Sequence, residues 1–178
     1  MENEQKKPRR EKSELREWIQ AIVIAVVLAF IIRMFFFDFV MVDGLSMYPT
    51  LNDGDRLIVN KLEYKVGEPE YGDIVILHYN QTVEYVKRVV AVGGDTISIR
   101  DEVVYLNGEV LNEPYINPDP YEDFSEVTVP EGEYFVMGDN RANSSDSRYA
   151  DLGFVSEDQM VGHVMACYWP FSDFGGVE

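Results

Sequence analysis

The sequence predicts a mainly β domain of packed antiparallel sheets, preceded by one transmembrane α-helix. Three features indicate this fold class: one long apolar run near the N-terminus, a succession of β-branched segments after it, and turn signals between those segments. The 178 residues suffice for one domain with a small appendage. Because 46% of the residues are hydrophobic and 13% are aromatic, the chain can build a core and is not globally disordered.

The apolar run over residues 18–37 contains 20 residues and would span about 30 Å as a helix, the thickness of a hydrocarbon core. A buried soluble helix is disfavoured, because the apolar residues lie all round the segment instead of forming a stripe. A cleaved signal peptide is disfavoured, because the run is long and no small-residue cleavage site precedes the bulky residues 34–37. We therefore expect a single uncleaved anchor over residues 18–37, with Arg33 extending toward the headgroups.

Charge is distributed unevenly on the two sides of this anchor. The first 16 residues hold six basic and four acidic side chains, whereas residues 38–178 hold eight basic and 27 acidic ones. The basic residues before the anchor are Lys6, Lys7, Arg9, Arg10, Lys12 and Arg16. The positive-inside rule therefore predicts a single-pass protein of the cell membrane, with residues 1–17 in the cytoplasm and residues 38–178 outside.

The composition excludes several classes of function. A net charge of −17 argues against a nucleic-acid partner, because binding phosphates requires clustered lysine and arginine. Cys167 is the only cysteine, which rules out an internal disulfide and a thiolate zinc site. The two histidines, His78 and His163, cannot form a histidine-rich metal cluster. We expect no cofactor and no metal.

The segments after the anchor have the β-branched composition and the turn boundaries of strands. The predicted strands are residues 56–60, 73–79, 82–92, 96–100, 103–106, 109–111, 133–137 and 163–169. Asn107-Gly108 is the strongest hairpin signal, because this dipeptide suits a type I′ turn. Residues 112–126 carry three prolines and five acids and are expected to form an exposed loop, inside a small inserted hairpin region around residues 97–133. Residues 156–159 form a weak capping box, the only helix start expected outside the membrane.

Three motifs contain the side chains that could carry out chemistry, since neither histidine is placed like a catalytic base. The first is Ser46 in the loop 44–51, where a serine is most often a solvated hydroxyl. The second is the run 85–90, which contains Lys87. The third is the segment 138–148, whose simplest interpretation is a polar turn held by acid–arginine pairs.

Lys87 is the most informative of these residues. In an extended strand the side chains alternate, so Lys87 shares an apolar face with Tyr85 while Arg88 points to the other face. A lysine on an apolar face requires a reason, although an edge lysine that protects the sheet from mispairing is an alternative. Lysine can act as a base only if its pKa falls from about 10.4 to about 7–8, and burial can supply a depression of that size.

Together the three motifs resemble those of bacterial type I signal peptidases, and the resemblance spans nearly the whole chain. Residues 46–51 resemble the nucleophile motif, residues 85–95 the base motif, and residues 138–148 the last motif. Ala91 and Gly93 stand where many members have glycine and proline, in the turn after the base. The single anchor is similar to the Gram-positive-like forms with one transmembrane helix. The resemblance implies the signal-peptidase/LexA-like β fold.

The resemblance also implies a membrane-bound serine endopeptidase that removes signal peptides from exported preproteins at the outer face of the cytoplasmic membrane. Its partners would be signal-peptide-bearing preproteins and the lipid bilayer. Ser46 would be the nucleophile, Lys87 the general base and Ser144 the hydroxyl that orients the lysine amine. Four further residues would form structural pairs: Asp139 with Arg141, and Asp146 with Arg148.

The oxyanion site is the least determined part of the resemblance. The backbone N–H of Ser46 is the natural donor. Some members add a serine hydroxyl two positions before the nucleophile, and this chain has Gly44 there. Glycine allows a close approach of the backbone, so a main-chain group near Gly44 is the candidate for the second donor.

Two other classes of function stay open on the sequence alone. One is a membrane-anchored binding or scaffold protein with an inactive protease fold. The other is a specialised Ser/Lys processing protease with another substrate. A self-cleaving, repressor-like enzyme needs a DNA-binding domain, for which the segment before the serine motif leaves no room.

The charge asymmetry generates a testable topology. Protease added to intact cells should digest the segment after residue 38 and leave the segment before Trp18 intact, because only the former lies outside. Immunoblotting of a tag at each end measures both results, with permeabilised cells as the control. Survival of the C-terminal tag in intact cells would contradict this orientation.

Overall fold

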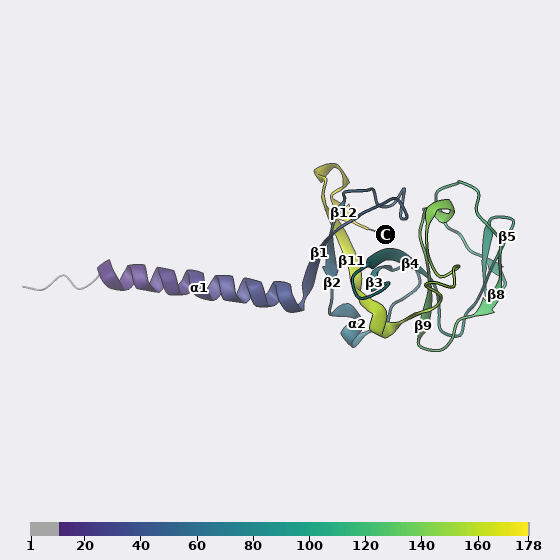
Figure 1. Cartoon of the computed structure of the whole chain (residues 1–178). Helices are drawn as coiled ribbons and strands as arrows, with labels where there is room; N and C mark the ends of the chain where they lie inside the picture. The colour runs from purple at the N-terminus through teal and green to yellow at the C-terminus, as the bar shows by residue number, and fades with distance from the viewer. Residues whose placement is uncertain (1–10, 178) are drawn as a thin grey trace, which may run out of the picture. The chain divides into compact units, whose positions relative to one another are not determined.

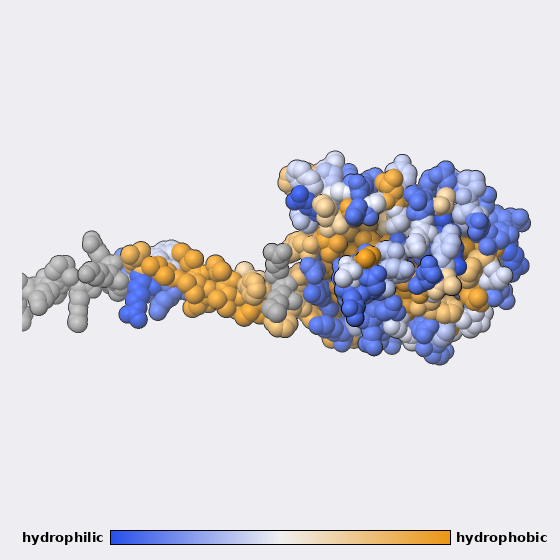
Figure 2. Space-filling model, in the orientation of Figure 1, coloured by the Kyte–Doolittle hydropathy of each residue, from blue (hydrophilic) through white to orange (hydrophobic). Residues whose placement is uncertain are grey.

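The computed structural model describes residues 11–177 and divides, at the bond between Phe36 and Phe37, into two compact units (Figure 1). The first unit contains one helix, α1 (Glu11–Phe35). Its residues Glu14–Ile32 form a stretch of 19 that is long and apolar enough to cross a membrane, by length and composition. Figure 2 shows hydrophobic side chains along this stretch, and those of residues 14–32 are exposed all round.

The end of α1 differs from the predicted end of the anchor. The helix stops at Phe35, because Phe37 already begins a strand that pairs with another segment. An apolar strand directly after an apolar helix leaves no hydropathy signal at their boundary. Most of the segment 1–17, predicted to be cytoplasmic, and the side chain of Arg33 lie outside the described residues.

The second unit is mainly β, as the sequence predicts (Figure 1). The larger of its two sheets contains β1 (Phe37–Met41), β2 (Arg56–Asn60), β3 (Ile74–His78), β4 (Glu84–Val92), β9 (Glu133–Met137), β10 (Val155–Ser156), β11 (Met160–Trp169) and β12 (Gly175–Gly176). The smaller sheet contains β5 (Thr96–Arg100), β6 (Val103–Leu106), β7 (Glu109–Val110) and β8 (Phe124–Thr128). Short helices connect them: α2 (Glu63–Val66), η1 (Arg141–Asn143), η2 (Glu157–Gln159) and η3 (Phe171–Asp173).

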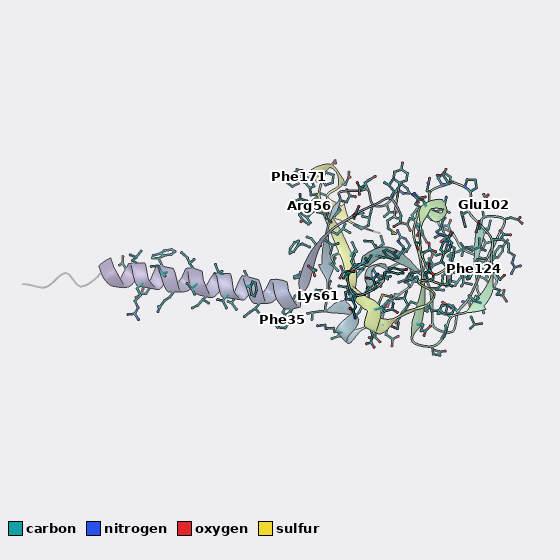
Figure 3. The ribbon with its side chains drawn as sticks, viewed as in Figure 1. Phe35, Arg56, Lys61, Glu102, Phe124 and Phe171 are labelled. Carbon is teal, nitrogen blue, oxygen red and sulfur yellow. The ribbon has the colours of Figure 1, made fainter. Side chains whose placement is uncertain are left out.

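Both sheets are antiparallel. The larger one has the strand order β1-β2-β11-β3-β4-β9-β10, with β12 beside β11, and the smaller one has the order β7-β6-β5-β8. Figure 3 shows Phe124 and Glu102 among the side chains of the smaller sheet. It shows Arg56 and Phe171 near the start of β2 and the end of β11. β4 continues into β5 through a short turn, and β8 is followed by β9, so the smaller sheet is inserted in the chain between two strands of the larger one.

Local sequence signals account for most of these elements. Asn107 and Gly108 both have positive φ (53° and 81°), as the type I′ hairpin between β6 and β7 requires. The predicted capping box of Ser156 and Gln159 is confirmed, although it starts only the single turn η2. β8 was not predicted, because it begins inside the segment 112–126, which looks like an exposed loop. Two of its side chains, Phe124 and Val127, nevertheless pack on the core of the smaller sheet.

One feature of β4 prepares the site. β4 pairs with another strand on at least one side along its whole length. Its first half, residues 84–87, pairs only with β3. Pairing with β9 begins at Arg88, which lies opposite Met137. Within the described chain, the first half of β4 therefore keeps one edge without a neighbouring strand.

Candidate active site

Ser46 and Lys87 come together although 41 residues separate them in the chain. The Lys87 Nζ donates to Ser46 Oγ at 2.9 Å and to the carbonyl oxygen of Val86 at 3.0 Å. Lys87 is only 2% exposed. A buried amine that contacts a serine hydroxyl is the arrangement of a nucleophile and its base.

The loop that carries Ser46 is held in place by two of its own side chains in the core and by hydrogen bonds from Asn140. Met47 and Leu51, on either side of a helical turn, are buried in the core below the loop. From outside, the backbone N–H of Asn140 donates to the carbonyl of Ser46 at 3.0 Å, and the Asn140 side chain donates to the carbonyl of Leu45 at 3.0 Å. The serine hydroxyl is therefore held on a loop whose carbonyls are already bonded.

The surroundings of Lys87 favour its neutral form. Burial lowers the pKa of Lys87 from its ordinary value of 10.5 to about 8, and the nearby Arg148 acts in the same direction. Asp146 and Asp139 oppose this by stabilising the ammonium ion. The ring of Tyr85, whose centroid lies 4.9 Å from Nζ, also favours the charged form. Desolvation dominates, so a substantial neutral fraction exists at mildly alkaline pH.

Ser144 lies beside Ser46 but is not bonded to Lys87. Its Oγ is buried and has no hydrogen-bond partner among the described residues. A Cβ built on Gly138 would collide with both the Ser46 carbonyl and the Ser144 Oγ, so glycine is what lets these three residues meet. The predicted role of Ser144 in orienting the lysine remains a prediction.

One of the two predicted structural pairs is present and the other is wrong. Asp146 pairs with Arg148 at 2.8 Å, as predicted. Asp139 pairs with Arg88 at 2.8 Å, and not with Arg141. Strand alternation turns Arg88 away from Lys87, as expected, and this direction brings its guanidinium to Asp139.

Arg141 takes a partner that the sequence did not single out. Both of its terminal nitrogens donate to Glu113, at 3.0 and 2.6 Å, and neither side chain is more than 3% exposed. Glu113 lies in the acidic segment 112–126, where nothing local distinguishes it from four other acids. The position of Glu113 between Leu111 and Pro114 is the only local signal that could have suggested that its side chain is buried.

The two candidate donors to the oxyanion, the N–H groups of Ser46 and Gly44, differ in their hydrogen bonds. The N–H of Ser46 has no acceptor among the described residues and is free to donate. The N–H of Gly44 donates to Asp53 Oδ1 at 2.8 Å, and its φ of +108° suits glycine. The Gly44 N–H would have to leave Asp53 before it could serve as a second donor.

A pocket of about 100 Å³ opens beside the two residues. It lies between the segment that follows β1 and the unpaired half of β4. Its lining residues are Val40, Met41, Val42, Asp43, Ser46, Met47, Ile76, Glu84, Tyr85, Val86 and Lys87. Seven of these eleven residues are apolar or aromatic, Asp43, Glu84 and Lys87 add charged groups, and the nucleophile and the base are both part of the lining.

Neither histidine belongs to this site. His78 pairs with Glu84 at 3.3 Å on an exposed surface, and His163 lies 3.0 Å from Glu63. No group of three or more His, Cys, Asp or Glu residues able to hold a metal ion occurs in the described part of the chain.

Comparisons with known proteins agree on one family. The family described as "Signal peptidase, peptidase S26" matches residues 15–169. Signal peptidase I T of Bacillus subtilis (strain 168) is 43% identical over 182 residues, which cover 96% of this chain and 94% of the relative. Signal peptidase IB of Staphylococcus aureus is 39% identical over 181 residues, which cover 92% of this chain and 94% of the relative. The crystal structure of a signal peptidase I from Enterococcus faecalis V583 has a TM-score of 0.47 and 33% identity, and the match covers 53% of this chain and 95% of that one.

The buried amine generates a stability prediction. Because folding lowers the pKa of Lys87 from 10.5 to about 8, the unfolded chain holds an extra proton between these two pH values, and below pH 8 the folded state carries the full penalty of a buried ammonium ion. Lys87→Met should therefore raise the free energy of unfolding by about 2–3 kcal/mol at pH 7, and this gain should shrink as the pH rises from 8 toward 10.5.

Urea unfolding of the detergent-solubilised chain, followed by near-ultraviolet circular dichroism, measures this difference. Lys65→Met, at an exposed lysine of α2, is the matched control and should show no such gain. A Lys87→Met chain that is no more stable than the parent at pH 7 would contradict the desolvation argument.

Proposed function

Because the chain belongs to the signal peptidase family, peptidase S26, we infer that it is a serine endopeptidase that removes signal peptides from preproteins. The observation that carries this inference to particular residues is the 2.9 Å contact between the buried Lys87 amine and the Ser46 hydroxyl. An inactive scaffold protein is not favoured, because it would have no need of an amine buried against a serine.

The reaction follows from this contact. The neutral Lys87 amine takes the proton of Ser46 as Oγ attacks the carbonyl carbon of the peptide bond, which forms the C–O bond and a tetrahedral oxyanion. The Ser46 N–H, which has no acceptor among the described residues, donates to that oxyanion. The C–N bond then breaks, and the Lys87 ammonium returns the proton to the departing amine. A water molecule, deprotonated by Lys87, hydrolyses the ester on Ser46 and restores the enzyme.

Ser144 and the neighbouring loop support this chemistry. The Ser144 hydroxyl, buried and without a partner among the described residues, orients the lysine amine once a substrate has excluded water. Asp139 with Arg88, and Asp146 with Arg148, hold the loop in place and do not act on the substrate. Asp146 and Arg148 have opposite effects on the pKa of the Lys87 amine, Asp146 raising it and Arg148 lowering it.

The substrate docks as an extended strand in the pocket between β1 and β4. The unpaired edge of residues 84–87 offers backbone groups to a peptide, which is a common docking mode. The pocket is small, so it favours small side chains. In a strand alternate side chains point the same way, so the residues one and three before the cut enter the pocket together.

The bilayer is the second partner. An apolar helix of this length fits a single membrane anchor, and the basic residues before it fit a cytoplasmic N-terminus. The catalytic unit then lies on the outer side of the cell membrane, where exported preproteins emerge.

The first test concerns the two reacting groups. Ser46→Ala and Lys87→Ala should each abolish cleavage of a preprotein, because the hydroxyl and the amine act in one step. Lys87→Arg should fail as well, since a guanidinium keeps its proton at working pH. His78→Ala and His163→Ala are controls that should retain most activity. The measurement is the N-terminal sequence and yield of the mature product, and a folded but inactive histidine variant would overturn the assignment.

The second test concerns the pocket. Placing tryptophan immediately before the cut in a preprotein should block cleavage, because a small pocket cannot admit it. The same tryptophan two residues before the cut should have little effect, because that side chain points away from the pocket. Gel-based processing rates of the two substrates measure the difference, and equal rates would mean that the pocket does not select the substrate.

A further inference from the structure

A segment outside the three motifs contacts residues 139–141, which in turn bond the loop that holds Ser46. Residues 113–117, here called the brace, lie between β7 and β8 on the side of the smaller sheet. We propose that the brace positions the nucleophile, and that Glu113 and Asn117 are positioning residues for peptide cleavage. The proposal rests on the proposed function, since it concerns the same Ser46.

The first contact of the brace reaches Gly138. Glu113 binds both terminal nitrogens of Arg141, and the Arg141 Nε donates to the carbonyl of Gly138 at 2.9 Å. Gly138 is the residue whose Cα lies against the Ser46 carbonyl and the Ser144 hydroxyl. A displacement of the Gly138 carbonyl would therefore move the surface on which Ser46 rests.

The second contact reaches Ser46 through an amide relay. The Asn117 N–H donates to the Asp139 carbonyl at 3.0 Å, and the Asn117 side-chain amide donates to Asn140 Oδ1 at 3.3 Å. This fixes the orientation of the Asn140 amide, whose Nδ2 donates to the Leu45 carbonyl. The Asn140 backbone N–H bonds the Ser46 carbonyl itself. One residue of the nucleophile loop, Leu45, thus depends on the side chain that Asn117 orients, and Ser46 depends on the backbone of the same Asn140.

The third contact reaches the same loop from below. The Arg88 guanidinium lies over the ring of Tyr115, 3.9 Å from its centroid, and binds Asp139 through two nitrogens. Asp139 also accepts a hydrogen bond from Thr50 Oγ1 at 2.5 Å. Thr50 lies in the nucleophile loop, so Arg88 and that loop meet at one carboxylate, and the brace reaches it through the Tyr115 ring under the Arg88 guanidinium.

Asn117→Ala tests the relay with the least disturbance, because Asn117 is only partly buried. In the full-length protein in detergent, kcat for a preprotein should fall about tenfold while KM changes less than twofold, since the substrate pocket is intact. Asn112→Ala is the matched control: Asn112 is exposed, lies in the same connection between β7 and β8, and, within the described residues, makes no hydrogen bond to the nucleophile loop or to residues 138–141. This control should keep the parental kcat.

Glu113 requires a paired variant, because removing it alone leaves the buried Arg141 unpaired and destabilises the fold. The double variant Glu113→Met/Arg141→Met replaces the whole pair by apolar side chains, which is often neutral for stability. It should melt near the parental temperature and still lose kcat, because the bond from Arg141 to the Gly138 carbonyl is gone. A purely structural pair would instead recover kcat together with stability.

A readout independent of cleavage separates this proposal from the proposed function. Chains labelled with ¹³Cε-lysine report the titration of Lys87, whose signal is identified by its absence from Lys87→Met. The midpoint, about 8 in the parent, should move toward 10.5 in Asn117→Ala, because a released Ser46 loop admits water to the amine.

Each outcome decides the matter. An Asn117→Ala chain with the parental kcat and the parental Lys87 titration overturns the proposal, and so does a kcat that merely follows the melting temperature across all variants. If the parent cleaves no preprotein, the proposed function fails, and the Lys87 titration alone then decides whether the brace positions the site.

Discussion

The structure depends on one constraint: the amine of Lys87 must stay out of water while it touches Ser46. Burial lowers its pKa to about 8 and is the largest of the effects that act on it. An amine buried on a strand face needs packed neighbours on every side, and β3 and β4 supply them in register, with Val75 opposite Lys87. The hydrogen bonds to Ser46 Oγ and the Val86 carbonyl then satisfy the amine without adding charge.

The charged side chains around this amine are arranged to hold the loop. Three arginine–carboxylate pairs are nearly or completely buried, and each guanidinium also donates to a backbone carbonyl: Arg88 to Gly72, Arg141 to Gly138 and Arg148 to Arg141. Buried ion pairs contribute little net stability, but removing one partner is costly. Their main effect here is therefore geometric, because they leave the segment from Gly138 to Arg148 few other conformations.

Local sequence patterns predicted those features of the structure that depend on residues close together in the chain. Five strands of the larger sheet (β2, β3, β4, β9 and β11), the Asn107-Gly108 hairpin and the direction of Arg88 all follow from alternation and turn chemistry, whereas β1, β10 and β12 were not predicted. Ser46 and Lys87 were predicted from their motifs, and their 2.9 Å contact agrees with that prediction. What could not be predicted depends on distant segments. Arg141 pairs with Glu113, and Asp139 with Arg88, because the fold brings these residues together. The sequence contains many other acidic residues that could equally have been the partner of either arginine. β8 was not predicted for the same reason. Its own composition is typical of a loop, and it forms a strand because it pairs with β5.

The unpaired half of β4 has a consequence for the free protein. Exposed strand edges are where proteins pair with one another and aggregate, and most folds shorten, charge or cover them. Here the open stretch is only four residues long, Glu84 charges its outer end, and the Lys87 amine already occupies the Val86 carbonyl. A second copy of the chain would find too few free backbone groups to form a lasting ladder. The same shortness means that a docked peptide gains little from its backbone alone, so release of the cleaved fragment is not opposed by a long run of hydrogen bonds.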